Sequence, residues 1–292
     1  MGGFIIELPI LHALKEWGRL TRIEVVVRTP CDALLENYDW IDAIHVRDRG
    51  VLGRFRPAAR SLLDPFDLRL YLRQRGGIDL GALFVRSRLT LGVESFDPKL
   101  GSSGAVAHKF SILRNVLGDD MPTAPPVRIS LRPTRTDEAF SKAGFSRGDR
   151  ILSIGPGAGR PRKMWPEDRF CRLIGALGSK FDRIALLGSP SEMELCDSIA
   201  AKTGATSLAG RLEITQTAAL LAEAELHVGN DSALGHLAAS QGCPAVAIGP
   251  AYEYFTPWRG YSVPGQLQEI SVDEVVRVVT GNRLATAESV RV

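Results

Sequence analysis

This 292-residue chain has little cysteine, no long apolar run and no excess of one charge. Its four cysteines are Cys31, Cys171, Cys196 and Cys243. Their spacing fits neither a disulfide framework nor a metal site, so we expect reduced thiols, as in a cytosolic protein. No apolar run reaches the roughly 20 residues that a membrane-spanning helix needs. The first apolar run is interrupted by Glu7 and Pro9, which argues against a signal peptide.

The charge balance argues against a protein that binds nucleic acids in general. With 36 basic and 33 acidic residues, the net charge of +3 is too small for a general nucleic-acid binder. Hydrophobic residues at 45% and charged residues at 24% are typical of globular proteins. The length suggests two domains of ordinary size. We therefore expect an intracellular, cytoplasmic protein with no nucleic-acid partner.

Apolar runs of strand length alternate with helical patterns along the whole chain. In the first half, strands are expected at 23–27, 43–46 and 68–72, and helices at 33–38 and 106–117. In the second half, strands are expected at 150–154, 183–187, 226–228 and 244–248, and helices at 166–177, 191–203, 215–224 and 232–241. This alternation predicts an α/β fold with parallel sheets, covered by helices on both faces.

Prolines mark the division between the two halves. The segment 122–133 carries four of them, too many for a continuous helix or a central strand. We predict domains at 1–133 and 134–292, each with a doubly wound, Rossmann-like sheet. Near the end of the chain, Ser271 and Glu274 form a capping-box pattern, and Gly281 is expected to end the helix that follows.

The segment 228–241 is the most informative part of the sequence. An apolar strand ends in Gly229-Asn230-Asp231, and a helical pattern follows. The first amides of a helix lack internal partners and attract anions. Asp231 and Ser232 add a carboxylate and a hydroxyl there, and His236 lies one turn further on the same face as Ser232. Each residue alone has a structural explanation, since Asp231 or Ser232 could simply cap the helix.

A glycine-rich loop precedes a basic residue at the end of another strand. The loop Gly155-Pro156-Gly157-Ala158-Gly159 could be an ordinary connection, or it could bring its backbone close to a diphosphate, with Lys163 supplying positive charge. Lys163 could equally belong to a solvated basic cluster. The loop is not a dinucleotide fingerprint, because Arg160 stands three residues after Gly157.

These motifs together resemble glycosyltransferase family 9, the bacterial lipopolysaccharide heptosyltransferases. The resemblance is carried by Gly229–Ser232, by 236–239 with Gly242, Pro244 and Gly249-Pro250, and by 156–159 with Lys163-Met164-Trp165-Pro166-Glu167. A weaker match is 9–15, which is similar to the first helix of the family. The likeness is strong from about 150 to 257 and thin before that.

The resemblance implies a two-domain fold of the GT-B type, with two parallel sheets facing a central cleft. It implies inverting, metal-independent sugar transfer, by analogy heptose from ADP-heptose, onto the lipopolysaccharide core or a related saccharide acceptor. No cofactor is implied. The implied donor-binding residues are Pro156, Gly157, Ala158, Gly159, Lys163, Glu192, Asp231, Ser232, Ala233 and His236.

Three of these residues have particular implied roles. In the family, the lysine at the position of Lys163 contacts the donor phosphates, and a glutamate near Glu192 contacts the ribose. Glu192 has an equally good structural explanation, because Ser191 could cap a helix with Glu192 in its first turn. Ala233 replaces the usual glycine of the motif, which would narrow the sugar pocket.

The N-terminus departs from the family pattern. Family members open with a strand followed by an acidic residue, the proposed general base, and counting back from Pro9 places Gly3 at that position. Glu7 is the nearest carboxyl group. We favour a natural protein that continues upstream over a degenerate member of the family. A non-catalytic nucleotide-sugar binder remains an alternative, and a dinucleotide-dependent oxidoreductase is a weaker one.

A group of arginines raises the question of a membrane contact. Positive charge gathers at Arg47, Arg49, Arg54, Arg56 and Arg60. Such a run is usually a solvated face. The competing hypothesis is that it meets the phosphates of a lipid-linked acceptor, with peripheral contact at the inner face of the cytoplasmic membrane.

Overall fold

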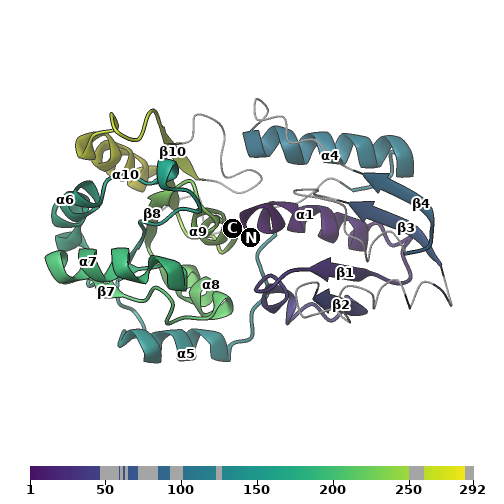
Figure 1. Cartoon of the computed structure of the whole chain (residues 1–292), viewed down its shortest axis with the longest axis horizontal. Helices are drawn as coiled ribbons and strands as arrows, with labels where there is room; N and C mark the ends of the chain where they lie inside the picture. Colours follow the sequence, from purple (N-terminus) through teal and green to yellow (C-terminus); the bar gives the residue numbers. More distant parts are fainter. Residues whose placement is uncertain are drawn as a thin grey trace. The chain divides into compact units, whose positions relative to one another are not determined.

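The computed structural model describes residues 1–46, 59, 62, 65–71, 85–92, 101–122, 127–249 and 260–286. Its contacts divide the chain into two compact units, Gly3–Ser130 and Leu131–Val292, which we describe separately (Figure 1). The division lies three residues before the expected boundary at 133/134. Pro133 is already the N-cap of a helix, and the carbonyl of Arg132 accepts a hydrogen bond from the Arg135 amide, so 131–133 lead into the second unit.

The described part of the N-terminal unit contains two separate pairs of parallel strands. Its elements are α1 (Gly2–Glu16), β1 (Glu24–Val27), the 3-10 helix η1 (Ala33–Leu35), β2 (Ala43–Val46), β3 (Phe66–Tyr71), β4 (Ser87–Gly92) and α4 (Gly101–Leu117). Strand β1 pairs with β2, and β3 pairs with β4. A small core joins one face of α1 to α4 through Ile10, Leu14, Phe110 and Leu113.

The sequence predicted some of these elements imperfectly. Helix α1 begins at Gly2 and continues through Pro9, so it is longer than the segment 9–15 that resembles the first helix of the family. The helix expected at 33–38 is only the short η1. Strand β4 was not predicted, because its residues alternate between polar and apolar types over only a short stretch.

The C-terminal unit contains one continuous sheet. Its strands are β5 (Ile151–Gly155), β6 (Arg183–Leu186), β7 (Thr206–Ser207), β8 (Leu226–Asn230), β9 (Ala245–Gly249) and β10 (Tyr261–Pro264). Its α-helices are α5 (Thr134–Ala143), α6 (Glu167–Leu177), α7 (Met193–Thr203), α8 (Ile214–Glu223), α9 (Ala233–Ser240) and α10 (Val272–Thr286). Three 3-10 helices accompany them, η2 (Pro161–Lys163), η3 (Gly178–Lys180) and η4 (Pro190–Glu192). All eight strands and helices expected in this half up to residue 248 are present, with ends shifted by no more than two residues.

All the strands of this sheet are parallel, in the order β10-β9-β8-β5-β6-β7. The chain runs from β5 outward to β7 on one side and then returns to β8 on the other side of β5. The strand order therefore reverses between β5 and β8. In open parallel sheets, ligands bind at the carboxyl ends of the strands beside such a reversal.

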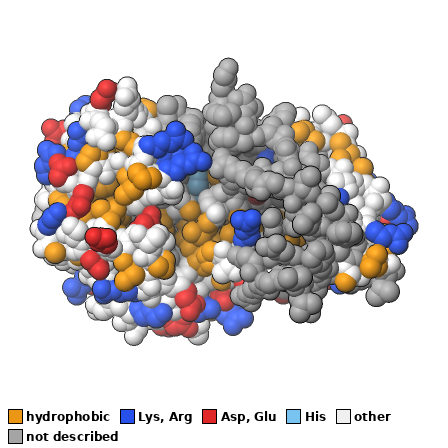
Figure 2. All heavy atoms as spheres, viewed as in Figure 1, with side chains coloured by type: hydrophobic (Ala, Val, Ile, Leu, Met, Phe, Trp, Pro, Cys, Tyr) orange, Lys and Arg blue, Asp and Glu red, His pale blue; other side chains and the backbone are white. Residues whose placement is uncertain are grey.

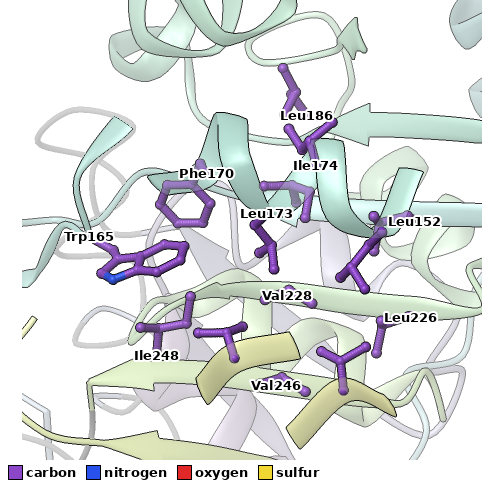
Figure 3. Close-up of a cluster of buried hydrophobic side chains, with 14 of the residues drawn as sticks. Leu152, Trp165, Phe170, Leu173, Ile174, Leu186, Leu226, Val228, Val246 and Ile248 are labelled. Carbon is purple, nitrogen blue, oxygen red and sulfur yellow. The ribbon is translucent and has the colours of Figure 1, made fainter. Parts of the chain in front are cut away.

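One face of the sheet carries the larger hydrophobic core. Leu152, Val228, Val246 and Ile248 lie on the strands opposite Phe170, Leu173 and Ile174 of α6 (Figure 3). Trp165 is almost fully buried and packs edge-to-face on Phe170, with ring centroids 5.0 Å apart. This core holds the segment before α6 against the carboxyl ends of the strands.

The other face of the sheet carries small residues together with the buried His227. Strand pairing sets Ser153 opposite His227 and Gly155 opposite Gly229. A Cβ at Gly155 would lie 3.3 Å from Leu234 of α9, so this helix packs close to the strands. Helix α8 packs against both α5 and α9. Helices therefore flank the sheet on both faces, as expected for a doubly wound domain.

Helix α10 differs from the expectation at its end. It begins at the predicted capping box, where the Ser271 amide and hydroxyl both donate to Glu274, but it continues through Gly281 to Thr286. A glycine that ends a helix usually takes a positive φ, and Gly281 does not. The prediction that Gly281 ends the helix is wrong.

Candidate functional site

The site lies where β5 and β8 end, at the reversal of strand order. The glycine loop follows β5, and the Asn230-Asp231-Ser232 segment ends β8 and leads into α9. The two strands are hydrogen-bonded neighbours, and Gly155 lies opposite Gly229 in their register. A Cβ at Gly229 would be 2.8 Å from the Gly155 carbonyl oxygen, so glycine is needed for this close approach. The pairing brings together two motifs that are far apart in the sequence.

A buried histidine supports this pair of glycines. His227 of β8 is fully buried, and a Cβ at Gly155 or at Gly229 would lie 3.2 Å from its ring. Its Nδ1 is hydrogen-bonded to the Ser153 hydroxyl at 2.6 Å. Burial lowers the pKa of His227 to about 4, because the charged form would lose its hydration. His227 is therefore neutral at physiological pH, and its ring packs against Gly155 and Gly229.

Lys163 reaches the start of α9. It ends η2, and its ammonium group forms an ion pair with the carboxylate of Asp231. The side chain of Lys163 is 41% exposed, whereas that of Asp231 is 19% exposed. The cation thus faces solvent beside a helix N-terminus, which is a suitable place for a negatively charged ligand. The structure brings Lys163 and Asp231 together, as a shared donor site requires.

Ser232, Ala233 and His236 form the first turns of α9. Ser232 has the N-cap position with an extended backbone, so the cap is Ser232 rather than Asp231. Its side chain makes no capping hydrogen bond to the helix. Ala233 begins the helix, and His236 is buried one turn later. The carboxylate of Asp231 is paired with Lys163.

Glu192 lies against the glycine loop. A side chain at Gly157 would collide with the Glu192 carboxylate, so these two residues are in direct contact. Glu192 Oε2 accepts hydrogen bonds from the Ser189 amide at 2.7 Å and from the Ser189 hydroxyl at 2.8 Å. The expected cap at Ser191 is wrong, because Ser189 is the N-cap of η4. The structure places Glu192 beside the loop and also gives it a structural role.

Asn230 connects these segments, although the sequence analysis assigned it no role of its own within the motif. It is fully buried, its Oδ1 accepts the Trp165 amide at 2.9 Å, and its Nδ2 donates to the Pro156 carbonyl at 2.7 Å. A signal was available in the sequence. An amide side chain at the end of an apolar strand must be hydrogen-bonded if it is buried, and the loops at the same edge supply the partners.

The two residues considered for the general base lie in the other unit. Gly3 and Glu7 are both part of α1. The Glu7 carboxylate forms an ion pair with Lys109 of α4, and both side chains are largely buried. A base at Glu7 would therefore be held in an ion pair with Lys109. The five arginines considered for a membrane contact, Arg47, Arg49, Arg54, Arg56 and Arg60, lie outside the described residues, as does Pro250.

The described residues lack two further features. Within those ranges, no group of three or more His, Cys, Asp or Glu side chains could hold a metal ion. None of the helices found there is long and apolar enough to cross a membrane. On the visible face of the C-terminal unit, basic and acidic side chains are interspersed (Figure 2).

A parallel doubly wound domain with a glycine loop, a lysine and a helix start at its strand reversal is typical of nucleotide-binding α/β domains. Residues 87–267 match the family model described as glycosyltransferase family 9 (heptosyltransferase). The chain belongs to this family. The resemblance inferred from the motifs is confirmed.

Curated relatives and a solved structure agree with this assignment. Lipopolysaccharide heptosyltransferase 3 of Escherichia coli K12 is 32% identical over 117 residues, which cover 38% of this chain and 34% of that protein. Lipopolysaccharide heptosyltransferase 2 of the same strain is 28% identical over 187 residues, covering 61% of this chain and 50% of that protein. These matches span half or less of the length of the relatives.

The structural match is more extensive. The structure of E. coli ADP-heptose LPS heptosyltransferase II superposes with a TM-score of 0.76 at 20% identity, covering 98% of this chain and 96% of that chain. At this identity the likeness is evidence for the fold. It confirms the predicted fold class, α/β of the GT-B type.

Proposed function

We propose that this protein is a glycosyltransferase that moves a sugar, heptose from ADP-heptose, onto the lipopolysaccharide core or a related saccharide acceptor. The observation that carries the proposal is the convergence of Lys163, Asp231, the glycine loop and the start of α9 at the strand reversal. Family membership and the names of the relatives support the sugar and the acceptor. The donor's nucleoside diphosphate would bind in the C-terminal unit.

The proposed chemistry is a direct displacement with inversion at the anomeric carbon. The acceptor hydroxyl oxygen forms a bond to the anomeric carbon and gives its proton to a general base, while the bond to the diphosphate breaks and the diphosphate leaves with increased negative charge. The ammonium of Lys163 and the backbone amides that begin α9 are the groups that would stabilise this charge. No metal ion or other cofactor is part of the proposal, since a cation and a helix start occupy the same place.

The experiment that tests donor binding is calorimetry with ADP on the full chain. Lys163→Ala should raise the dissociation constant for ADP about tenfold or more, because it removes the cation nearest the helix start. Lys180→Ala is the matched control, since Lys180 is an exposed lysine at the end of η3. An unchanged affinity in Lys163→Ala would remove Lys163 from the site, and a chain that does not bind ADP would contradict the proposal.

Transfer itself is tested with ADP-heptose and a heptose-deficient lipopolysaccharide acceptor. Turnover should survive an excess of chelator, because the proposed leaving-group stabilisation uses only protein groups. An absolute requirement for Mg²⁺ or Mn²⁺ would contradict that chemistry. If Glu7 is the general base, Glu7→Gln should lower turnover by about 10²-fold or more while ADP affinity stays the same.

A second function is favoured by one specific feature, the glycine at position 3. A chain with an intact donor site and no base would be a nucleotide-sugar binder without transferase activity. Tight ADP binding with no transfer would support this function.

For a lipid-linked acceptor, the proposal also includes a contact between the arginine-rich segment and the membrane surface. Vesicles with and without anionic lipid test it directly.

A further inference from the structure

Asn230 has an unusual position among the polar residues of the C-terminal unit. It is the last residue of β8, it is fully buried, and both ends of its amide are hydrogen-bonded to backbone groups. Its partners are 65 and 74 residues away in the sequence. The amide orientation follows from these partners, because only oxygen accepts the Trp165 N–H and only nitrogen donates to the Pro156 carbonyl.

The three backbone segments joined by this amide are those that carry the candidate donor-binding groups. Pro156 belongs to the glycine loop, and the Gly157 carbonyl also lies 3.5 Å from Asn230 Nδ2. Trp165 follows Lys163 by two residues. Asp231, the ion-pair partner of Lys163, is the next residue after Asn230. A single side chain therefore links the loop, the lysine segment and the start of α9.

The segment around Trp165 is held from its other side as well. The indole N–H of Trp165 donates to the Ile270 carbonyl at 3.0 Å, and the ring is almost fully buried. With its backbone N–H bound to Asn230 and its indole bound to Ile270, Trp165 has little freedom to move. The position of Lys163 two residues earlier depends on this double attachment, because η2 is a single short turn with no buried residue.

We propose that Asn230 is a positioning residue for the donor diphosphate, an inference that rests on the proposed function. Asn230 acts through its neighbours: it holds the glycine loop and the Lys163 segment in the arrangement that the diphosphate needs before the diphosphate arrives. Ligand binding then does not have to order these segments, which increases affinity. Loss of the amide leaves a buried N–H and a buried carbonyl without partners, and the two segments shift to find new ones.

The test is ADP calorimetry on three variants of the full chain with graded changes. Asn230→Asp retains an acceptor for the Trp165 amide but places a second oxygen against the Pro156 carbonyl. Asn230→Ser is too short to reach both partners, and Asn230→Ala removes both hydrogen bonds. Each should raise the ADP dissociation constant about tenfold or more. Leu177→Ala, a truncation in the core at the far end of α6, is the control for general destabilisation and should leave ADP affinity unchanged.

A double-mutant cycle separates positioning from a structural role. If Asn230 acts by placing Lys163, the variant with both Asn230→Ala and Lys163→Ala should bind ADP at least about threefold more tightly than the product of the two single effects predicts. Multiplicative effects would show that Asn230 does not act through Lys163 and would overturn the inference.

The other possible results separate a failure of the inference about Asn230 from a failure of the proposed function. If the parent chain binds ADP and Lys163→Ala weakens it, but all folded Asn230 variants bind as the parent does, this inference fails while the proposed function stands. If all three Asn230 variants fail to fold and Leu177→Ala folds, the residue is needed for folding and the inference is again overturned. If the parent chain does not bind ADP, the proposed function is what fails.

Discussion

The strands of the two units differ in how completely they are buried. In the C-terminal unit, β5 and β8 are buried at every residue, and helices cover both faces of the sheet. In the N-terminal unit, β1 and β2 each have only one buried residue, and the described strands form two separate pairs. Strands buried on both faces must be apolar almost throughout, whereas half-exposed strands carry mixed residues.

This difference has a consequence for the site. A sheet that is packed on both sides can hold loops at its carboxyl edge in one arrangement, because any shift of a strand would disturb both cores. The glycine loop and Asp231 follow strands of this kind, and Asn230 is the last residue of one. The candidate donor groups are thus placed by the more rigidly packed of the two units.

A leucine-to-alanine substitution should lower the free energy of unfolding much more in the C-terminal unit than in the N-terminal unit. Leu152→Ala in β5 removes a fully buried side chain and should lower the free energy of unfolding by about 2–5 kcal/mol. Leu89→Ala in β4, where the residue is 40% exposed, should cost about 1 kcal/mol or less. Urea denaturation of both variants measures the difference. If both variants lost the same free energy of unfolding, the difference in burial between the two units would not determine their stability.

Acid should destabilise the C-terminal unit through His227. Its pKa is lowered to about 4 in the folded protein, whereas the unfolded chain takes up the proton near the ordinary value of 6.5. Stability is therefore intact above pH 6.5 and decreases as the pH falls towards 4. The loss should reach about 3 kcal/mol, because one pKa unit corresponds to about 1.4 kcal/mol.

The control for this prediction is His227→Asn, measured by urea denaturation at pH 7.5 and pH 4.5. The variant lacks the titrating group, so its stability should fall less than that of the parent over this interval. A parent and a variant with the same pH dependence would assign the acid sensitivity to other groups.

Removing an exposed ion pair should change the free energy of unfolding equally little in either unit. The pair Arg172–Asp168 lies on α6, and Arg19–Asp120 lies in the N-terminal unit, with all four side chains about half exposed or more. Asp168→Asn and Asp120→Asn should each change the free energy of unfolding by less than about 1 kcal/mol. High salt should reduce both effects further. A large change in the free energy of unfolding at one pair would contradict this prediction and would mean that the pair is coupled to other groups.

The C-terminal half was the more predictable part of the chain. Its longer strands are mostly apolar and helices α6 to α9 have clear periodicity, so these elements were predicted from neighbouring residues. Helix α5 and strands β7 and β10 were not predicted. In the N-terminal half, β4 alternates between residue types over a short stretch, and α1 includes a proline that would usually be placed near a helix end. Local patterns are weaker where elements are short or half-exposed.

The alternation of strands and helices, the parallel sheet and the motifs at the strand ends could be predicted without the structure, because these features depend on residues close together in the chain. The tertiary structure decided which motifs meet. Strand order placed β8 beside β5, and only then could Asn230 bind Trp165 and Pro156 and could Lys163 reach Asp231. It also decided that Ser189 rather than Ser191 caps η4. The physical reason is that a buried polar group takes whichever partner the packed strands bring within hydrogen-bonding distance, and no local pattern encodes that distance.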